Sequence, residues 1–190
     1  MAVAGRVLRF GPENGTLLLH TKRTGVASKV GHDLTLEVAA WSAEAEIPEP
    51  ADPSSGRVAA TLDLSSIQVR AGSGGVVPLT DRDRREIEAN TRQLLAIDRY
   101  PTATFASDRI SVTDTEATVN GVLSLHGSRA PVRLYVRQVA PDQLLAEASV
   151  AQTAFGVKPY SAFLGALRLR DEVSVECRLD LTRPEREPVS

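Results

Sequence analysis

The sequence contains a single cysteine, Cys177, among its 190 residues. This scarcity excludes an intrachain disulfide, and it excludes a metal site that is built from several cysteines. Cys177 shares strand parity with Val173, Val175, Leu179 and Leu181, which predicts a small side chain in the core.

Long apolar runs are lacking as well. No run approaches the ~20 residues that a transmembrane helix requires. Near the start of the chain, Arg6 and Arg9 interrupt the apolar residues before they reach the length of a signal-peptide core. We therefore expect no stable membrane insertion and a cytoplasmic location.

Neither sign of charge predominates, because the formal net charge is −2 and acidic and basic residues are interspersed. Such a chain has no overall electrostatic attraction to nucleic acid or to an anionic membrane, so we expect no nucleic-acid partner. Aromatic residues make up only 4% of the chain, and the 42% apolar and 24% charged residues are typical of a soluble globular protein. The length suits a single domain over residues 1–190, with a core at about 14–182 and a frayed C-terminal tail at 183–190.

Histidine is scarce too, with only His20, His32 and His126. None of them stands in a nucleophile-elbow motif or at a metal-ligand spacing. No pair of carboxylates is singled out for glycoside chemistry. The sequence thus predicts no catalytic residue, no metal and no cofactor, and a zinc-assisted enzyme assembled from the three histidines stays a further alternative.

What the sequence does contain is alternation of apolar and polar residues with a period of two. The clearest stretches are residues 34–38, 41–47, 57–64, 117–125, 132–137, 144–150 and 173–181. Half-buried antiparallel strands produce this pattern, since successive side chains point to opposite faces. With the remaining stretches, the count reaches about eight or nine strands separated by turn residues. We therefore predict an all-β fold, an antiparallel up-and-down β-barrel of about eight strands.

One segment breaks the alternation. Residues 81–95 place Arg84 and Glu88, and then Glu88 and Arg92, four positions apart, which suits the solvated face of a helix. Thr80 precedes this segment as a candidate N-cap. The pattern predicts a helix over about 81–95 that lies across one end of the barrel.

Five stretches together resemble the YceI family, the lipocalin-like polyisoprenoid-binding domain. In chain order they are TKRTGVASKVGHDLTLEV, DRDRREIEANTRQLLAIDRYP, DRYPTATFAS, NGVLSLHGSRAPVRLYV and TAFGVKPYSAFLGALRLRDEVSVECRLDL. The Gly-His-Asp of the first stretch is similar to one branch of that family. The resemblance implies a lipocalin-like barrel with a helix across one end, a short helix near 159–164, and an apolar interior that accepts an isoprenoid chain.

The chain departs from the family pattern within its helix. Many members carry His-Leu-Arg before the Tyr-Pro pair, whereas this chain has Glu88 to Arg92 at the comparable place. Contacts that the family makes through that triplet therefore do not carry over.

An eight-stranded barrel encloses either a packed core or one small ligand. Here the inward rows mix Leu and Val with Ala, which favours a slot. The expected apolar lining consists of Leu34, Leu36, Val38, Val58, Ala60, Leu62, Leu94, Phe105, Val119, Leu123, Leu134, Ala146, Ala148, Phe155, Phe163 and Val175. Candidates for contacts with a polar head group at the mouth are His32, Lys22, Arg23, Lys29 and Lys158.

His32 has two interpretations, because it stands at the head of the apolar row Leu34, Leu36 and Val38. It is either a polar contact at one end of the cavity or an imidazole that satisfies backbone groups at a strand start. In the second interpretation Asp33 points away from the cavity and braces the turn at Gly31.

The leading functional hypothesis is a protein that binds, carries or sequesters a long apolar ligand, isoprenoid or fatty-acid-like, in the barrel interior. The alternative is a stress-associated or protein-interaction barrel that holds no lipid. Edge strands make a homodimer a further expectation. The many inward alanines bear on the first hypothesis, because small inward residues leave room inside a barrel of this size.

Overall fold

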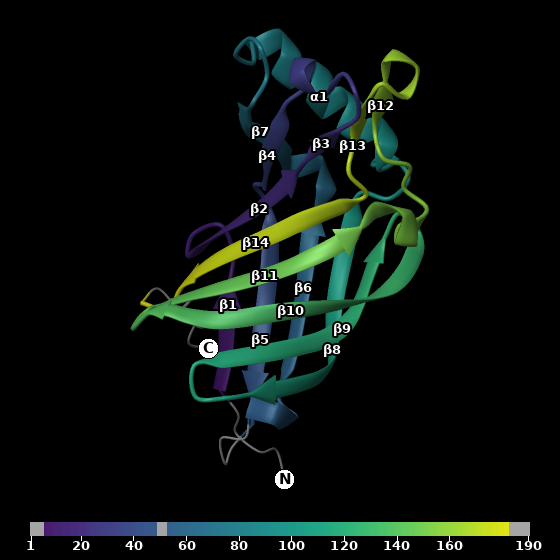
Figure 1. Cartoon of the computed structure of the whole chain (residues 1–190). Helices are drawn as coiled ribbons and strands as arrows, with labels where there is room; N and C mark the ends of the chain where they lie inside the picture. The colour runs from purple at the N-terminus through teal and green to yellow at the C-terminus, as the bar shows by residue number, and fades with distance from the viewer. Residues whose placement is uncertain (1–5, 49–52, 183–190) are drawn as a thin grey trace.

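The computed structural model describes residues 6–48 and 53–182. The predicted frayed tail at 183–190 lies outside the described residues. Within them, the structure is almost entirely β, with one α-helix, α1 (Asp81–Leu94), at one end of a large curled sheet (Figure 1).

The large sheet has eleven strands among the described residues, and every neighbouring pair is antiparallel. Their order is β1-β5-β6-β8-β9-β10-β11-β14-β2-β4-β7. Their bounds are β1 (Arg6–Phe10), β2 (Gly15–Thr21), β4 (Asp33–Val38), β5 (Trp41–Ile47), β6 (Arg57–Asp63), β7 (Ile67–Ser73), β8 (Thr102–Val112), β9 (Glu116–Leu125), β10 (Ser128–Ala140), β11 (Gln143–Ala151) and β14 (Glu172–Asp180). A smaller sheet follows the order β12 (Ser161–Ala162), β13 (Leu167–Leu169) and β3 (Arg23–Thr24).

The eleven strands form a half-barrel instead of the eight-stranded barrel that the sequence predicted (Figure 1). Two long stretches of the chain are each bent into two strands, which accounts for much of the difference between eleven strands and the predicted eight. β4 turns into β5 through Ala39 and Ala40, and β6 turns into β7 through a 3-10 turn at Leu64–Ser66. The bends lie side by side, because the Ala40 N–H donates to Ser66 Oγ at 2.9 Å. Because β5 and β6 stand near one end of the strand order and β4 and β7 at the other, the two bends connect the opposite ends of the sheet.

The helix α1 agrees with the prediction for residues 81–95 and is attached to the last strand of the sheet order. Thr80 and Asp83 form a capping box, with the Thr80 N–H donating to Asp83 Oδ2 at 2.8 Å. Glu88 Oε1 accepts the N–H of Val69 in β7 at 2.9 Å, and Arg84 donates to the Val69 carbonyl at 3.2 Å. The helix thus satisfies backbone groups of an edge strand that would otherwise face water.

The short helix predicted near 159–164 is present only as a single 3-10 turn at Phe163–Gly165. That segment contains β12 and a tight turn at Phe163–Gly165, which leads into β13. Phe163 and Leu164 adopt positive φ angles of 51° and 54°, in the left-handed region. Two successive residues in this conformation reverse the chain, so a helix cannot continue through them.

Three clusters of buried apolar side chains make up the core. The main cluster joins β1, β2, β4, β5 and β7 to the segment after α1, and it includes Leu34, Leu36, Val38, Trp41 and Ile97. The second is centred on Phe105, Ile110 and Val119, and the third on Val150, Phe155 and Val157.

Candidate functional site on the concave face

The concave face of β6, β8, β9 and β10 carries a continuous apolar surface. Phe105, Ile110 and Val119 are buried there. Half-buried side chains from the neighbouring strands pack against them, namely Val58, Ala60, Leu123, Val132, Leu134 and Val136. On β6, β9 and β10 these residues occupy every second position, as the alternation in the sequence predicted. On β8 an irregularity between Ser107 and Arg109 changes the parity, so that Phe105 and Ile110 reach the same cluster.

Leu123 connects the whole interior, since it packs against all three core clusters. Val175 of β14 packs against two of them, although β10 and β11 separate β14 from β9 in the sheet. Both side chains pack against the main cluster, which also contains buried residues of β1, β4 and β7. The face that bears Leu123 and Val175 is therefore the inner one.

The predicted lining falls into two groups in the structure. The buried members are Leu34, Leu36, Val38, Phe105, Val119, Ala148 and Phe155. The members that remain half-buried on strands of the curled sheet are Val58, Ala60, Leu62, Leu123, Leu134, Ala146 and Val175. Apolar side chains on an inner face bury themselves when neighbours fill the space, so the half-buried members leave apolar surface uncovered on this face.

Two predicted lining residues lie elsewhere. Phe163 is 67% exposed at the tip of the β12–β13 hairpin, because the left-handed turn directs it outward. Leu94 is half-buried at the end of α1 and belongs to none of the three clusters. Leu95 packs against the core in its place, and Ile97 is buried in it. The chain leaves the helix at Leu95.

Ala146 occupies a central position on the inner face. It lies directly opposite Val136 of β10 and Cys177 of β14. Both of these neighbours pack against core clusters, so Ala146 shares their inward direction. The residue is half-buried, so its neighbours do not cover it completely.

Cys177 is predicted to be chemically inert in the folded protein. Burial raises the pKa of its thiol to about 12, so the reactive thiolate is rare near pH 8. We expect a thiol reagent to modify Cys177 slowly in buffer and rapidly in denaturant. Equal rates in the two solvents would show that the side chain is not enclosed.

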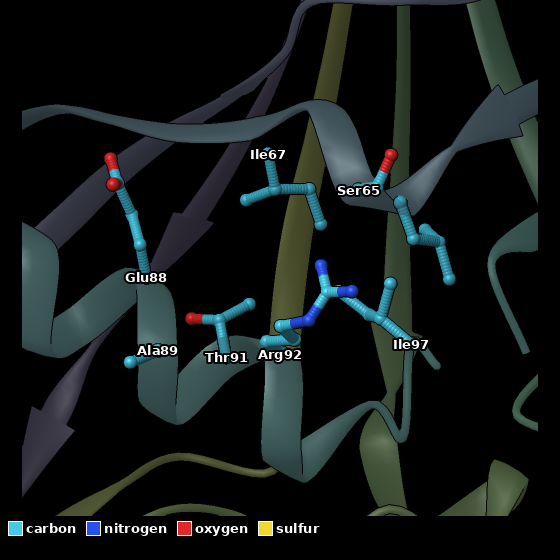
Figure 2. A pocket seen from close by; sticks show the side chains of 8 residues that line it. Ser65, Ile67, Glu88, Ala89, Thr91, Arg92 and Ile97 are labelled. Atoms are coloured by element: carbon cyan, nitrogen blue, oxygen red, sulfur yellow. The ribbon is translucent and has the colours of Figure 1, made fainter. Parts of the chain in front are cut away.

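A separate groove of about 220 Å³ lies between α1 and the bend that joins β6 to β7 (Figure 2). Leu64, Ile67 and Ile97 line it and also belong to the main core cluster. Glu88 and Arg92 line it from the helix (Figure 2). Arg92 is paired with Asp98, and Glu88 binds β7, so the polar groups of this groove already have partners within the protein. The sequence did not indicate this groove.

The candidate head-group residues Lys22 and Arg23 are engaged by Asp33. The Asp33 carboxylate accepts the Arg23 backbone N–H at 2.9 Å and lies 3.4 Å from Lys22 Nζ. Arg23 also donates to the Gly31 carbonyl. Asp33 therefore braces the turn before β4, as one interpretation of the sequence expected.

His32 contacts the loop after β7. Its Nε2 donates to the Val77 carbonyl at 2.8 Å, and its ring stands against Gly75. The alternation of β4 buries Leu34, Leu36 and Val38, but His32 precedes the strand and does not extend that row. The interpretation in which the imidazole satisfies a backbone group accounts for this geometry.

We expect Asp33 to give the protein an acid-sensitive contribution to stability. Burial pulls the pKa of Asp33 upward, but the Arg23 N–H and the Lys22 ammonium outweigh it and leave the pKa below its usual 3.8. Because the folded pKa is the lower one, the contribution is present above the unfolded pKa and is lost as pH falls through the folded pKa. Denaturant unfolding of wild type and Asp33→Asn between about pH 6 and pH 2 should give curves that converge in acid. Curves that stay parallel would contradict this role.

The three histidines do not form a metal site in the described residues, where no group of three or more His, Cys, Asp or Glu side chains could hold a metal ion. His20 contacts Thr35 Oγ1 through Nδ1 at 3.2 Å. His126 donates from Nδ1 to the Phe155 carbonyl at 3.2 Å and stacks edge-on with Tyr100. Each imidazole thus has its own partner within the fold.

A family model for YceI-like domains matches residues 17–181 of this chain. The chain belongs to the YceI-like family. The resemblance of the five sequence stretches is thereby confirmed. No curated protein matched the chain.

Two solved structures share the fold of this YceI-like protein. The Burkholderia cenocepacia protein BcnA matches with a TM-score of 0.62 and 17% sequence identity, over 87% of this chain and 94% of BcnA. A mutant of the Campylobacter jejuni YCEI protein matches with a TM-score of 0.50 and 12% identity, over 80% of this chain and 85% of the other. In the described part of the chain, no helix has the length and apolar character needed to cross a bilayer.

Proposed function

We propose that this protein binds an amphiphilic ligand with a long apolar chain, isoprenoid or fatty-acid-like, along the concave face, and carries or sequesters it. One observation carries the proposal. The half-buried apolar residues of the inner face, Val58, Ala60, Leu62, Leu123, Leu134, Ala146 and Val175, keep solvent contact although they face the hollow of the sheet. Membership of the YceI-like family supports the same ligand class.

The free energy available from such a surface is adequate. Burying an alkyl or prenyl chain gains about 0.8 kcal/mol per CH₂ group. Ten buried carbons contribute roughly 8 kcal/mol before ordering costs, which corresponds to micromolar binding. No charged partner is needed for the tail, so binding should depend on chain length more than on the head group.

We further propose that the curled sheet acts as a closed barrel in solution. If β4 with β5 and β6 with β7 are each treated as one bent strand, the pairing runs through β8, β9, β10, β11, β14 and β2 and returns to β4. That circuit corresponds to the barrel expected from the sequence, with β1 added beside β5. Such a barrel holds one small ligand when its inward residues are small, as Ala60 and Ala146 are.

A fluorescent polyene fatty acid such as cis-parinaric acid tests the proposal. Its fluorescence should rise saturably at micromolar concentration, and farnesol should displace it while a short alcohol should not. A signal that never saturates, or that farnesol and the short alcohol reduce equally, would contradict a defined apolar site. The proposal is for a binding protein, so no turnover of the ligand is expected.

A further inference from the structure

Three loops gather at the end of the molecule that also bears α1, and we call them the loop crown. They are residues 22–32, 73–79 and 158–170, and Figure 1 shows them beyond the tilted strands of the large sheet. The first loop contacts both others. The Ala27 N–H donates to the Ala166 carbonyl at 2.9 Å, and His32 bonds to Val77 at 2.8 Å. The crown is therefore one connected surface.

Large apolar side chains are concentrated on the crown. Val26 is 95% exposed, and Leu164 at the hairpin tip is completely exposed. Most of the large apolar residues that are exposed in the described ranges lie on these three loops, namely Val26, Val30, Val76, Val77, Phe163 and Leu164. The others lie on three strands of the large sheet, namely Val7 on β1, Val112 on β8, and Tyr135 and Val139 on β10. Clustered apolar exposure of this kind marks an interaction surface.

The hairpin tip holds two of these side chains outward at a conformational cost. Phe163 and Leu164 both have left-handed backbones, which non-glycine residues rarely adopt. The turn leads directly into β13, where Arg168 Nε donates to the Gly165 carbonyl at 2.9 Å. Contact with a partner would explain why a strained turn exposes two large apolar side chains.

The crown is also strongly basic. Its three loops contain no Asp or Glu and carry the basic side chains Lys22, Arg23, Lys29, Lys158, Arg168 and Arg170. The whole chain has a net charge of −2, so the positive charge is localised on this surface. Lys29 lies between Val26 and Val30 in sequence, which places a cation beside two exposed apolar groups.

Three acidic residues that flank the crown in sequence, Asp33, Asp83 and Asp171, have partners of their own, whereas Asp81 at the start of α1 is exposed. Asp33 binds Arg23 and Lys22. Asp171 accepts the Thr153 N–H at 2.8 Å, and Asp83 caps α1. Lys29, Lys158 and Arg170 are all exposed and are available to an anionic surface.

We propose that the loop crown docks peripherally on an anionic lipid bilayer, with its apolar tips in the interfacial layer and its basic side chains against lipid phosphates. Exposed apolar groups flanked by Lys and Arg are the combination that binds such a surface. A second copy of this chain is disfavoured as the occupant, because two crowns would bring like charges together. The docking does not depend on the ligand proposed for the concave face, and it differs from insertion of a spanning segment.

Vesicle co-sedimentation of the full chain, without added ligand, tests this proposal. The protein should bind vesicles that mix phosphatidylcholine with phosphatidylglycerol, and it should bind pure phosphatidylcholine weakly. Each basic side chain near the surface contributes about fivefold, so Lys29→Ala with Lys158→Ala should reduce binding roughly 25-fold. High salt should reduce it further, because the attraction is screened.

Matched variants separate the crown from the rest of the surface. Phe163→Ser with Leu164→Ser should reduce binding at least about tenfold, because the apolar tips no longer enter the interface. The control Tyr135→Ser with Val139→Ser removes two exposed apolar groups from β10 and should bind as wild type does. Circular dichroism checks that each variant is folded.

Three results would overturn the proposal. The first is equal binding of the protein to both vesicle types, and the second is equal binding by the crown variant and the control variant. The third is a dimer, seen by light scattering, that dissociates when Phe163→Ser and Leu164→Ser are introduced. The last result would identify a second copy of the chain as the occupant.

Discussion

Ala146→Phe is expected to reduce uptake of the apolar ligand at least about tenfold while the protein stays folded. Ala146 lies between Val136 and Cys177 on the inner face, and the residue is half-buried. A phenyl ring at this position extends into the space that the proposed chain occupies. The change is measured with the cis-parinaric acid titration, and its displacement by farnesol should weaken in parallel.

Ala59→Phe is the matched control for this prediction. Ala59 is exposed on β6, next to the inward Ala60 in sequence, so its side chain points to the opposite face. The same ring added there should leave uptake at the wild-type value. Equal uptake by Ala146→Phe and wild type would place the ligand away from this part of the inner face.

Phe155→Ala is expected to lower the free energy of unfolding by about 3–5 kcal/mol. The ring of Phe155 is only 1% exposed and packs in the third core cluster with Val150 and Val157. Its carbonyl also accepts the His126 ring N–H, so the same residue ties the β9–β10 turn to the end of β11. Removal of the ring leaves a cavity at this junction.

Phe163→Ala is the corresponding control, since it removes the same ring from a residue that is 67% exposed. Phe163→Ala should lower the free energy of unfolding by no more than about 0.5 kcal/mol, because removal of an exposed ring loses little buried surface. Guanidinium unfolding monitored by circular dichroism measures both variants. Similar losses for Phe155→Ala and Phe163→Ala would contradict the placement of these two side chains.

The sequence predicted the strands and the helix because their signals are local. Burial of Leu34, Leu36 and Val38 follows from period two, and the Thr80 cap marks where α1 begins. The family resemblance added the overall topology. The inner rows, including Ala60 and Ala146, could likewise be predicted, since parity assigns each residue to a face.

Other features depend on contacts that no local pattern contains. The bends at Ala39–Ala40 and Leu64–Ser66 divide two strands because a hydrogen bond joins residues that are far apart in sequence. The apolar Phe163 suggested a lining residue, but a left-handed turn moved it to the surface. His32 has the parity of the β4 row, yet it bonds to Val77, 45 positions later in the chain.

The loop crown illustrates the same limit. Each of its three segments is short, and the absence of acidic residues from any one of them carries little information. The fold brings the segments together through Ala27, Ala166 and His32, and only then does a localised positive charge emerge on a chain with net charge −2. The charge of a surface depends on tertiary contacts, which local sequence patterns do not reveal.

Native mass spectrometry of the protein purified from its own host tests the central claim most directly. We predict a population heavier than the polypeptide by the mass of one long-chain lipid, which collisional activation releases, and which Ala146→Phe loses while Ala59→Phe retains it. A single unliganded mass for wild type, unchanged when farnesol or a fatty acid is added in excess, would contradict an interior that accepts an apolar chain.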